Sequence, residues 1–479
     1  MTFGTASHVN PYFPTLSQLV DEGNQVTFFA PKTMLAFSSK YPKISAVEMQ
    51  LDPEQFDAIL HSTHEIGNST KTNVVPIFKG IVDLFKPSYH EMERFDNQYH
   101  PDLFICDIFH TACVEYANAK KKNLIFLLTN IGSLGVGESW YTPSLMYPVP
   151  QEKLVKSIRS RIEASINSLP SLDTILPLRT YMNALKDMKK ELHLESTRSS
   201  EIIKRHLVLT HNVIGLYKAR ELPTNVITIG PMLSQNIGKL DDELQIELDQ
   251  FQKSKTSVIY IAFGSGVNIS GHVGDKIFEA VELLLIENHD IAVVWALGKS
   301  DGSGWVVPQE LASRLLFKKW VNQRALLGHP SVTVFCTHGG IASLHESMYA
   351  GKPVLVTGMF GDQFLNAIAA QEAKIGLENK KMDFTPNSFK EKIVYLHKEI
   401  GDKDSELYHS VQKMKKIVEL NMETHQLYAK NLFEMAATVG YDHLVPITSK
   451  MTWWQINGEF YTLVASLLVG FLAMKVYFL

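Results

Sequence analysis

The segment from Phe317 to Gln363 guides the interpretation of the whole chain, and it reads FKKWVNQRALLGHPSVTVFCTHGGIASLHESMYAGKPVLVTGMFGDQ. Its central run, Val332–Thr337, is apolar and short, which predicts a buried strand of a parallel sheet. His338-Gly339-Gly340 follows directly, and a helical pattern begins there. Free N–H groups at a helix start, a glycine pair that permits close approach and an imidazole together predict a phosphate site.

Other side chains in this segment suit the remaining parts of a polar ligand. Ser343 adds a hydroxyl in the first helical turn, and Glu346 lies three residues further on the same helix face. A carboxylate there can accept hydrogen bonds from two vicinal hydroxyls, as a ribose presents. Trp320 offers a flat face for stacking, Gln323 an amide for a ring edge, and Asp362-Gln363 a pair for sugar hydroxyls. Each type of residue is commonly structural when alone, but their ordered occurrence favours a binding site.

Strands alternate with helix-length stretches on both sides of this segment. Buried runs predict strands at Gln25–Ala30, Asp102–Asp107, Asn123–Thr129, His206–Thr210, Val226–Ile229, Val258–Phe263, Ile291–Leu297, Val332–Thr337 and Pro353–Thr357. The alternation indicates βαβ units and parallel sheets. Gly230-Pro231 marks a break, so we expect two doubly wound α/β domains, at residues 1–230 and 231–448. Long helices over Asp404–Ala437 end the second domain and could pack back on the first. In such sheets ligands bind outside the carboxyl ends of the strands.

The segment resembles the signature of the UDP-glycosyltransferase family. The matching elements are W-x-x-Q at Trp320 and Gln323, LLGHP at Leu326–Pro330, F-x-T-H-G-G-x-x-S-x-x-E from Phe335 to Glu346, G-x-P at Gly351–Pro353 and DQ at Asp362-Gln363. The resemblance implies the GT-B fold, in which two Rossmann-like domains face each other and the C-terminal one holds most of the UDP-sugar.

The resemblance also implies which residues bind the UDP-sugar: Trp320 the uracil, Gln323 the uridine, His338, Gly340, Ser343 and Ser265 the diphosphate, Glu346 the ribose, and Asp362 with Gln363 the transferred sugar. Two positions depart from the family pattern. Asn322 and Gly358 stand where the family commonly has proline. Both positions shape the backbone, so these departures concern loop geometry more than chemistry.

Transfer of a sugar to a hydroxyl requires a base that takes the acceptor proton. Among enzymes of the family the catalytic histidine occupies a loop after the first strand, where His8 stands, and an aspartate after a later strand orients it, here Asp107. A neutral histidine suits the base role near pH 7, and a buried carboxylate fixes its tautomer. We expect displacement with inversion, in which the helix dipole and His338 stabilise the departing UDP. No metal or other cofactor is expected, because no DxD pair is positioned for Mg²⁺.

The C-terminus differs from the rest of the chain. No residue from Phe460 to Met474 is charged, and residues 460–479 would form a helix of about 30 Å, the thickness of a bilayer core. We therefore expect a transmembrane helix at 460–479, with a buried terminal helix as the alternative. The N-terminal MTFGTASHVNP resembles the end of a buried strand and shows no signal peptide. An endoplasmic reticulum location with lumenal catalytic domains is thus an expectation from the resemblance.

Composition limits the remaining classes of protein. The 479 residues include 46 Lys and Arg against 50 Asp and Glu, and 45% are apolar. These values are typical of a folded globular protein, and the near-neutral charge argues against nucleic acid as a partner. The cysteines say little: from Cys106, Cys113 and Cys336 neither a disulfide framework nor a CxxC metal pair can be read. Sequons at Asn68 and Asn268 permit a lumenal location.

The resulting functional prediction is transfer of a hexose from a UDP-sugar to a small lipophilic hydroxyl compound. UDP-glucose is favoured as donor and UDP-glucuronate is the alternative; the apolar residues around Trp140–Pro150 suggest the acceptor class. Three other functions are alternatives. A non-catalytic UDP-sugar-binding membrane scaffold could dispense with His8 or Asp107, and both are present. A nucleotide-sugar epimerase needs several acidic residues around the sugar, and a nicotinamide oxidoreductase needs a GxGxxG motif that is absent after an early strand.

Overall fold

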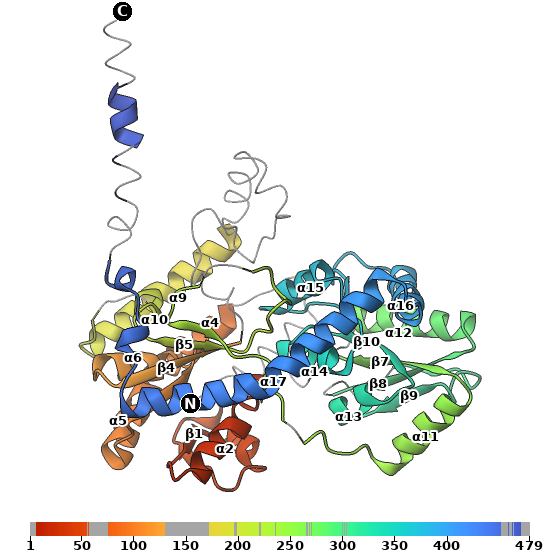
Figure 1. The fold of residues 1–479 in the computed structure, drawn as a ribbon, viewed down its shortest axis with the longest axis horizontal. Helices are drawn as coiled ribbons and strands as arrows, with labels where there is room; N and C mark the ends of the chain where they lie inside the picture. The colour runs from red at the N-terminus through yellow and green to blue at the C-terminus, as the bar shows by residue number, and fades with distance from the viewer. Residues whose placement is uncertain are drawn as a thin grey trace, which may run out of the picture.

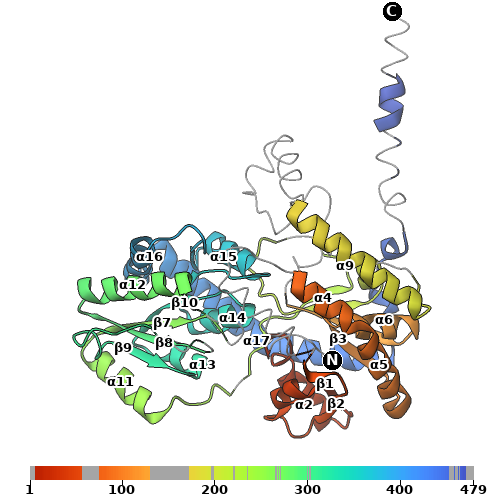
Figure 2. The same cartoon turned by 180° about the vertical axis from the view of Figure 1, so that it is seen from behind.

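The computed structural model is an α/β structure in two lobes, and it describes residues 6–54, 56, 75–129, 172–195, 199–219, 222–234, 236–264, 267, 269, 271–298, 300, 302, 304–451, 458, 462 and 464–470. The lobes lie side by side (Figures 1 and 2), and the long helix α17 (Glu406–Thr438) runs along both of them. The expected α/β class with parallel sheets is confirmed, because every strand pair in the described residues is parallel.

The first lobe is built on a four-stranded sheet of order β3-β4-β5-β6 and a separate pair, β1-β2. Its strands are β1 (Thr27–Pro31), β2 (Ser45–Met49), β3 (Leu103–Asp107), β4 (Asn123–Leu128), β5 (Leu207–Thr210) and β6 (Val226–Thr228). Its helices are α1 (Ala6–Val9), α2 (Phe13–Asp21), η1 (Lys32–Ser38, a 3₁₀ helix), α4 (Val75–Asp83), α5 (Phe85–Tyr99), α6 (Thr111–Ala119), α9 (Leu172–Glu191) and α10 (Ser199–Ile203).

Strand β4 shows why the apolar runs of this lobe form strands. Successive side chains of a strand point to opposite faces of the sheet. Leu124, Phe126 and Leu128 pack into the core formed with α5 and α6. Ile125 and Leu127 pack on the other face, in the core formed with α2 and α17. A strand covered on both faces must be apolar throughout, which is why its sequence shows a continuous run and no alternation.

The second lobe contains a six-stranded sheet of order β12-β11-β10-β7-β8-β9. Its strands are β7 (Ser257–Ala262), β8 (Ile291–Ala296), β9 (Leu315–Lys318), β10 (Val332–Thr337), β11 (Val354–Val356) and β12 (Gly376–Glu378). Its helices are α11 (Asp242–Lys253), α12 (Gly271–Glu287), α13 (Gln323–Gly328), α14 (Ile341–Ala350), α15 (Gln363–Glu372) and α16 (Pro386–Gly401), and η3 (Asp442–Leu444) and η4 (Ile447–Lys450) follow α17. The strand order reverses between β7 and β10, the place where doubly wound sheets bind their ligands.

Several expectations about local structure need correction. His8 was expected in a loop after a first strand, but it lies in the helical turn α1, which continues into α2 through the hydrogen bond from Tyr12 N to Val9 O; residues 1–5 lie outside the described residues. The long helices expected over Asp404–Ala437 are one helix of 33 residues, α17. This helix packs against α14 and α16 of the second lobe and against α2, β3 and β4 of the first.

The chain end and some other predicted features fall mostly outside the described residues. Of the expected membrane helix at 460–479, the structure describes only 462 and 464–470. Among the residues that are described, no helix combines the length and the apolar character needed to span a membrane. The sequons at Asn68 and Asn268 and the apolar residues around Trp140–Pro150 also lie outside the described residues.

Candidate active site

The turn after β10 has the geometry expected of an anion site. Gly340 is the N-cap of α14 and has no side chain to cap the first N–H groups of the helix. Gly339 has a positive φ of 82°, and a Cβ there would collide with Val356. A Cβ on Gly264, which follows β7, would lie 2.7 Å from Cε1 of His338. The turns after β7 and β10 are therefore in contact at the reversal point of the sheet, and glycine is required in both.

His338 lies in this contact as a neutral group. Its side chain is 3.3 Å from the Thr337 hydroxyl through Nδ1. Burial lowers the pKa of His338 to about 4, so the ring carries no charge near pH 7. It can donate one N–H to an anion, in addition to the N–H groups of α14. Ser265, the predicted partner across this contact, lies outside the described residues.

Three of the predicted binding residues meet in one hydrogen-bonded group on α13 and α14. Gln323 Nε2 donates to Ser343 Oγ at 3.1 Å and to Glu346 Oε2 at 2.7 Å. Tyr260, which the sequence did not indicate, donates its hydroxyl to Gln323 Oε1 at 3.2 Å. Burial raises the pKa of Glu346, and the hydrogen bond from Gln323 and the charge of Arg324 oppose that rise. The group presents a carboxylate held in place by an amide.

Trp320 and Asn322 lie on the loop that precedes this group. Trp320 is 71% exposed, which a stacking surface requires. Asn322 is the N-cap of α13, and its amide nitrogen donates to Ile237 O at 2.8 Å and to Lys239 O at 3.3 Å. The side chain thus ties the loop to the chain segment that enters the second lobe. This explains how the backbone is held without the proline that is common at this position.

Asp362 and Gln363 lie at the start of α15. Asn366, one turn later, donates to Asp362 Oδ2 at 3.3 Å and to Gly339 O at 2.7 Å, so it links the Asp362 carboxylate to the anion-binding turn. Gln363 Oε1 accepts from the N–H groups of Met359 at 2.9 Å and Phe360 at 3.2 Å. The Gln363 amide oxygen therefore shapes the preceding loop.

Gly358, the second departure from the family pattern, lies before this helix. A Cβ at Gly358 would lie 2.9 Å from Phe364 N and 3.0 Å from Gln363 C. The backbone of α15 thus packs directly on the residue where a proline is common. The absence of a side chain permits this close approach.

His8 and Asp107 form a hydrogen-bonded pair although 99 residues separate them. His8 Nδ1 is 2.7 Å from Asp107 Oδ2, and Asp107 Oδ1 accepts from Phe109 N at 2.9 Å. The Asp107 side chain is 1% exposed and that of His8 13%. With Nδ1–H donating to Asp107, Nε2 is the nitrogen that can accept a proton. The predicted pair is therefore brought together, with the geometry that a general base requires.

Carboxylates from both lobes act on His8. Burial alone would lower the pKa of His8, but attraction to Asp107, the hydrogen bond to Asp107 and attraction to Asp362 outweigh it, and the pKa is raised above 6.5. Burial raises the pKa of Asp362, and attraction to His8 acts in the opposite direction. Asp362 follows the second-lobe strand β11, so the predicted base and a predicted sugar-binding carboxylate lie near each other.

Phe109 is a further residue of this site that the sequence did not indicate. Its ring lies 5.2 Å from the His8 ring, centroid to centroid. It is 45% exposed, so an apolar surface adjoins the predicted base.

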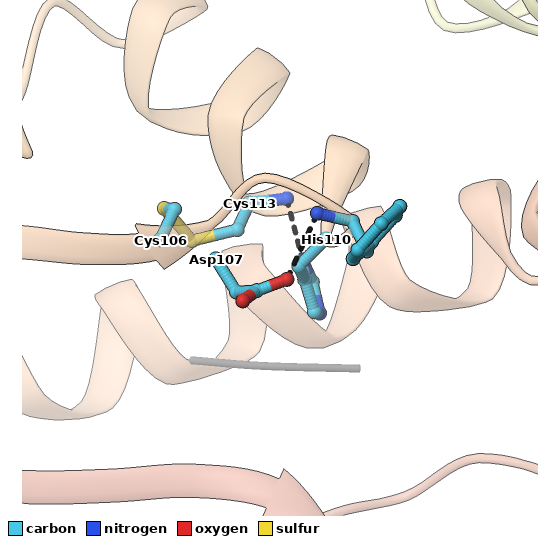
Figure 3. Close-up of a disulfide and its surroundings, with 5 residues drawn as sticks. Cys106, Asp107, His110 and Cys113 are labelled. Carbon is cyan, nitrogen blue, oxygen red and sulfur yellow. Dashed lines mark hydrogen bonds between the residues drawn. A yellow bond between two sulfur atoms is a disulfide. The ribbon is translucent and has the colours of Figure 1, made fainter. Parts of the chain in front are cut away.

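Cys106 and Cys113 form a disulfide beside Asp107 (Figure 3). Three cysteines alone did not indicate this pairing. Cys106 lies at the end of β3 and Cys113 in the first turn of α6, and the strand–loop–helix turn brings their Cα atoms to 5.9 Å. A separation of seven residues does not by itself indicate a disulfide, because the distance between the two cysteines depends on where the strand ends and the helix begins. Cys336 is free and buried.

The described residues contain no group of His, Cys, Asp and Glu side chains that could hold a metal ion. The site instead combines a hydrogen-bonded base, a helix start and buried carboxylates. Such groups can take a proton, stabilise an anion and bind hydroxyls.

Comparison with known proteins gives concordant results. Residues 167–393 match the family model "UDP-glucoronosyl and UDP-glucosyl transferase". The UDP-glycosyltransferase 1 of Phaeomoniella chlamydospora is 25% identical over 369 residues, which cover 75% of this chain and 74% of that protein. The crystal structure of the glycotransferase of kitacinnamycin superposes with a TM-score of 0.65 at 15% identity, covering 92% of this chain and 97% of the other. LpCGTa in complex with UDP superposes with a TM-score of 0.58 at 17% identity, covering 90% and 96%.

Proposed function

Since the chain belongs to the family of UDP-glucuronosyl and UDP-glucosyl transferases and transfers a sugar from a UDP-sugar, we propose that it transfers glucose, with inversion, to a hydroxyl of a small lipophilic acceptor. The match to the family model and the UDP-glycosyltransferase relatives favour a transferase over the non-catalytic scaffold, the epimerase and the oxidoreductase. The observation that supports inverting transfer with His8 as the base is the 2.7 Å contact between His8 and Asp107 near Asp362.

In the proposed reaction His8 acts as the base. Nε2 takes the proton of the acceptor hydroxyl as its oxygen forms a bond to the anomeric carbon of the sugar. The bond from that carbon to the diphosphate oxygen breaks, and UDP leaves with the electron pair. Attack from the face opposite UDP inverts the configuration. Asp107 keeps Nδ1 protonated and stabilises the imidazolium that forms.

The departing diphosphate would be stabilised by neutral donors. The first N–H groups of α14 begin at Gly340, and a Cβ on Gly340 would lie 2.5 Å from His338 Nε2, so the imidazole adjoins the helix start. The positive end of the helix dipole adds to these groups. Gly340, Ser343 and Ser265 would complete this part of the site. Oriented dipoles at a buried site stabilise developing charge without reorganisation, so this chemistry requires no metal.

The remaining donor contacts follow from the hydrogen-bonded group on α13 and α14. Trp320 would stack on the uracil, Gln323 would contact the uridine, and Glu346 would accept the ribose hydroxyls. Asp362 and Gln363 would bind the transferred sugar. UDP-glucose is favoured over UDP-glucuronate because a carboxylate at Asp362 repels a uronate at close range.

An apolar acceptor is supported by Phe109. Its half-exposed ring adjoins His8, so an acceptor that presents its hydroxyl to Nε2 would rest part of its body on this ring. Apolar contact at that position favours a lipophilic alcohol or phenol over a second sugar.

We also propose attachment to a membrane through residues 460–479, with the catalytic domains in the lumen of the endoplasmic reticulum. The uncharged run in the sequence supports the anchor. The buried Cys106–Cys113 disulfide supports an oxidising compartment. Extraction of membranes with alkaline carbonate and protease protection in sealed microsomes test both parts. Release of the full-length protein by carbonate contradicts the anchor, and digestion of the catalytic domains in sealed microsomes contradicts the orientation.

Incubation of the purified protein with radiolabelled UDP-glucose, UDP-glucuronate and a panel of phenols and sterols tests the function. The expected result is a glucoside whose anomeric configuration is opposite to that of the donor, and its loss in His8→Ala. Hydrolysis to free sugar without a glycoside, retention of configuration, or full activity of a correctly folded His8→Ala variant contradicts the proposal.

A further inference from the structure

The loop that carries Asp107 is closed by a covalent bond. Cys106 is the fourth residue of β3 and Cys113 the third residue of α6, and both side chains are fully buried. The disulfide between them encloses Asp107 and the residues up to Ala112. Figure 3 shows the sulfur bridge on one side of this loop and the Asp107 carboxylate on the other.

Hydrogen bonds inside the loop connect the bridge to the carboxylate. Cys113 N donates to His110 Nδ1 at 2.9 Å, which caps α6, and His110 N donates to Asp107 O at 2.9 Å. Phe109 N donates to Asp107 Oδ1 at 2.9 Å and sets the orientation of the carboxylate. Pairing of β3 with β4 places the backbone of Asp107 opposite Leu127. The strand therefore holds the backbone, whereas the loop holds the side chain.

The partner of this carboxylate is His8, whose side chain is 13% exposed. His8 lies in α1, a helix of only four residues. Its ring contacts Asp107 Oδ2 through Nδ1 at 2.7 Å and lies 5.2 Å from the Phe109 ring, centroid to centroid. A displacement of the carboxylate by about 1 Å would break that contact, and misplacement on this scale can cost roughly 100-fold in rate.

We infer that the Cys106–Cys113 disulfide is a positioning element of the catalytic base, which keeps Asp107 aligned with His8 so that turnover depends on the bridge. The inference rests on the proposed roles of His8 and Asp107. It adds that the enzyme loses activity on reduction, although neither cysteine touches the reacting atoms.

A disulfide that positions the base affects kcat and its pH profile, whereas a disulfide that only stabilises the fold affects the free energy of unfolding. The donor-binding residues lie in the second lobe, so loss of the bridge should leave the KM for UDP-glucose unchanged and lower kcat. The charged groups that act on His8 are Asp107 and Asp362, and His211 is the nearby imidazole. Loss of the contact with Asp107 removes the attraction that holds the proton, so the acid limb of the kcat profile should move to lower pH.

The test begins with a thiol count on the purified full-length enzyme. Alkylation under denaturing conditions should modify one cysteine, Cys336, and all three after reduction. The variant Cys106→Ala/Cys113→Ala is then compared with Cys336→Ala, which removes an equally buried thiol from the other lobe. We expect a loss in kcat of roughly 10- to 100-fold and the acid-limb shift in the double variant, and wild-type values in the control.

A second arm covers the case in which the double variant does not fold. Treatment of the native enzyme with a phosphine converts the disulfide to two thiols, with water supplying two protons and the oxygen of the phosphine oxide. Mass spectrometry follows the conversion and circular dichroism follows the fold. Activity should fall as the thiols appear and return on reoxidation.

Three results would overturn the inference: three free thiols in the native enzyme, a double variant with wild-type kcat and pH profile, or a folded, reduced enzyme with full kcat. An active His8→Ala variant refutes the proposed function instead, so the two failures are distinguishable.

Discussion

Asp107→Asn tests the catalytic pair most directly because it changes the chemistry and preserves the shape. The amide oxygen can still accept from Phe109 N, as Asp107 Oδ1 does at 2.9 Å. The amide NH₂ then faces His8 Nδ1, where a carboxylate oxygen stood at 2.7 Å. Two donors cannot share that contact, so Nδ1 must become the acceptor and the proton moves to Nε2. The nitrogen that should take the acceptor proton is then already protonated.

The size of the effect follows from this change of tautomer. An aspartate-to-asparagine change behind a catalytic histidine lowers kcat roughly 10⁴-fold in serine proteases, where the geometry is retained. We expect a loss of roughly 10³- to 10⁴-fold here, which is about 4 to 5.5 kcal/mol of activation free energy at 1.36 kcal/mol per factor of ten. The KM for UDP-glucose should change little, since Asp107 lies in the lobe opposite the predicted donor residues.

The pH dependence supplies an independent measurement. Burial lowers the pKa of His8, and Asp107 and Asp362 raise it to a net value above 6.5. Removal of the Asp107 charge leaves burial and Asp362, so the pKa falls and the acid limb of kcat/KM moves to lower pH. Because the folded-state pKa is raised, the pair stabilises the fold fully below the unfolded-state pKa of 6.5, and this stabilisation is lost as pH rises through the folded-state value. Asp107→Asn should therefore lower Tm more near pH 6 than near pH 8.

Steady-state kinetics with radiolabelled UDP-glucose and one acceptor, measured across pH, checks both parts. Asp102→Asn is the matched control, because it removes the same charge from the exposed opposite end of the same strand. The role of Asp107 as the partner of the catalytic base is refuted if Asp107→Asn keeps most of the wild-type kcat, or if the acid limb of its pH profile coincides with that of the Asp102→Asn control.

Three further substitutions test the second lobe. Gln323→Ala leaves the buried Glu346 without its 2.7 Å donor, so the KM for UDP-glucose should rise by roughly 10-fold or more, and an unchanged UDP affinity in calorimetry would contradict this. Gly358→Ala places a Cβ 2.9 Å from a backbone nitrogen and should lower the free energy of unfolding by about 1–3 kcal/mol. Gly401→Ala is the control, because nothing lies within 4 Å of a Cβ there, and it should be nearly neutral. Denaturant unfolding of the two variants measures the difference. Asn366→Ala removes the 2.7 Å bond to the anion-binding turn and should weaken UDP binding by roughly 10-fold, with equal affinity of the variant as the contrary result.

The strands that are buried on both faces were predictable because such strands have continuous apolar runs in the sequence. β10 coincides with the predicted Val332–Thr337, and β4 falls within Asn123–Thr129. The predicted strands omitted the short β12 (Gly376–Glu378) and the partly exposed β2 (Ser45–Met49) and β9 (Leu315–Lys318). Short or half-exposed strands have no continuous apolar run, and only pairing with a neighbour defines them.

Local pattern could not indicate contacts between distant segments. Tyr217 donates its hydroxyl to Asn366, 149 residues away, and Tyr260 donates to Gln323. Neither tyrosine lies in a motif, and each meets its hydrogen-bond partner only in the folded chain. The His8–Asp107 pair is equally distant, at 99 residues, and was predictable only because a family resemblance supplied the pairing.

The net charge of −4 gave no indication of an anionic ligand, and the structure provides a physical reason. A basic surface is needed when a protein attracts an anion through solvent, where charges are screened over about 10 Å. Here the predicted diphosphate site is a helix start, two glycine turns and a histidine whose pKa is lowered to about 4. These groups are uncharged at pH 7, and they act through oriented N–H dipoles at a buried position. Oriented dipoles of this kind stabilise the negative charge that develops on the diphosphate as UDP departs.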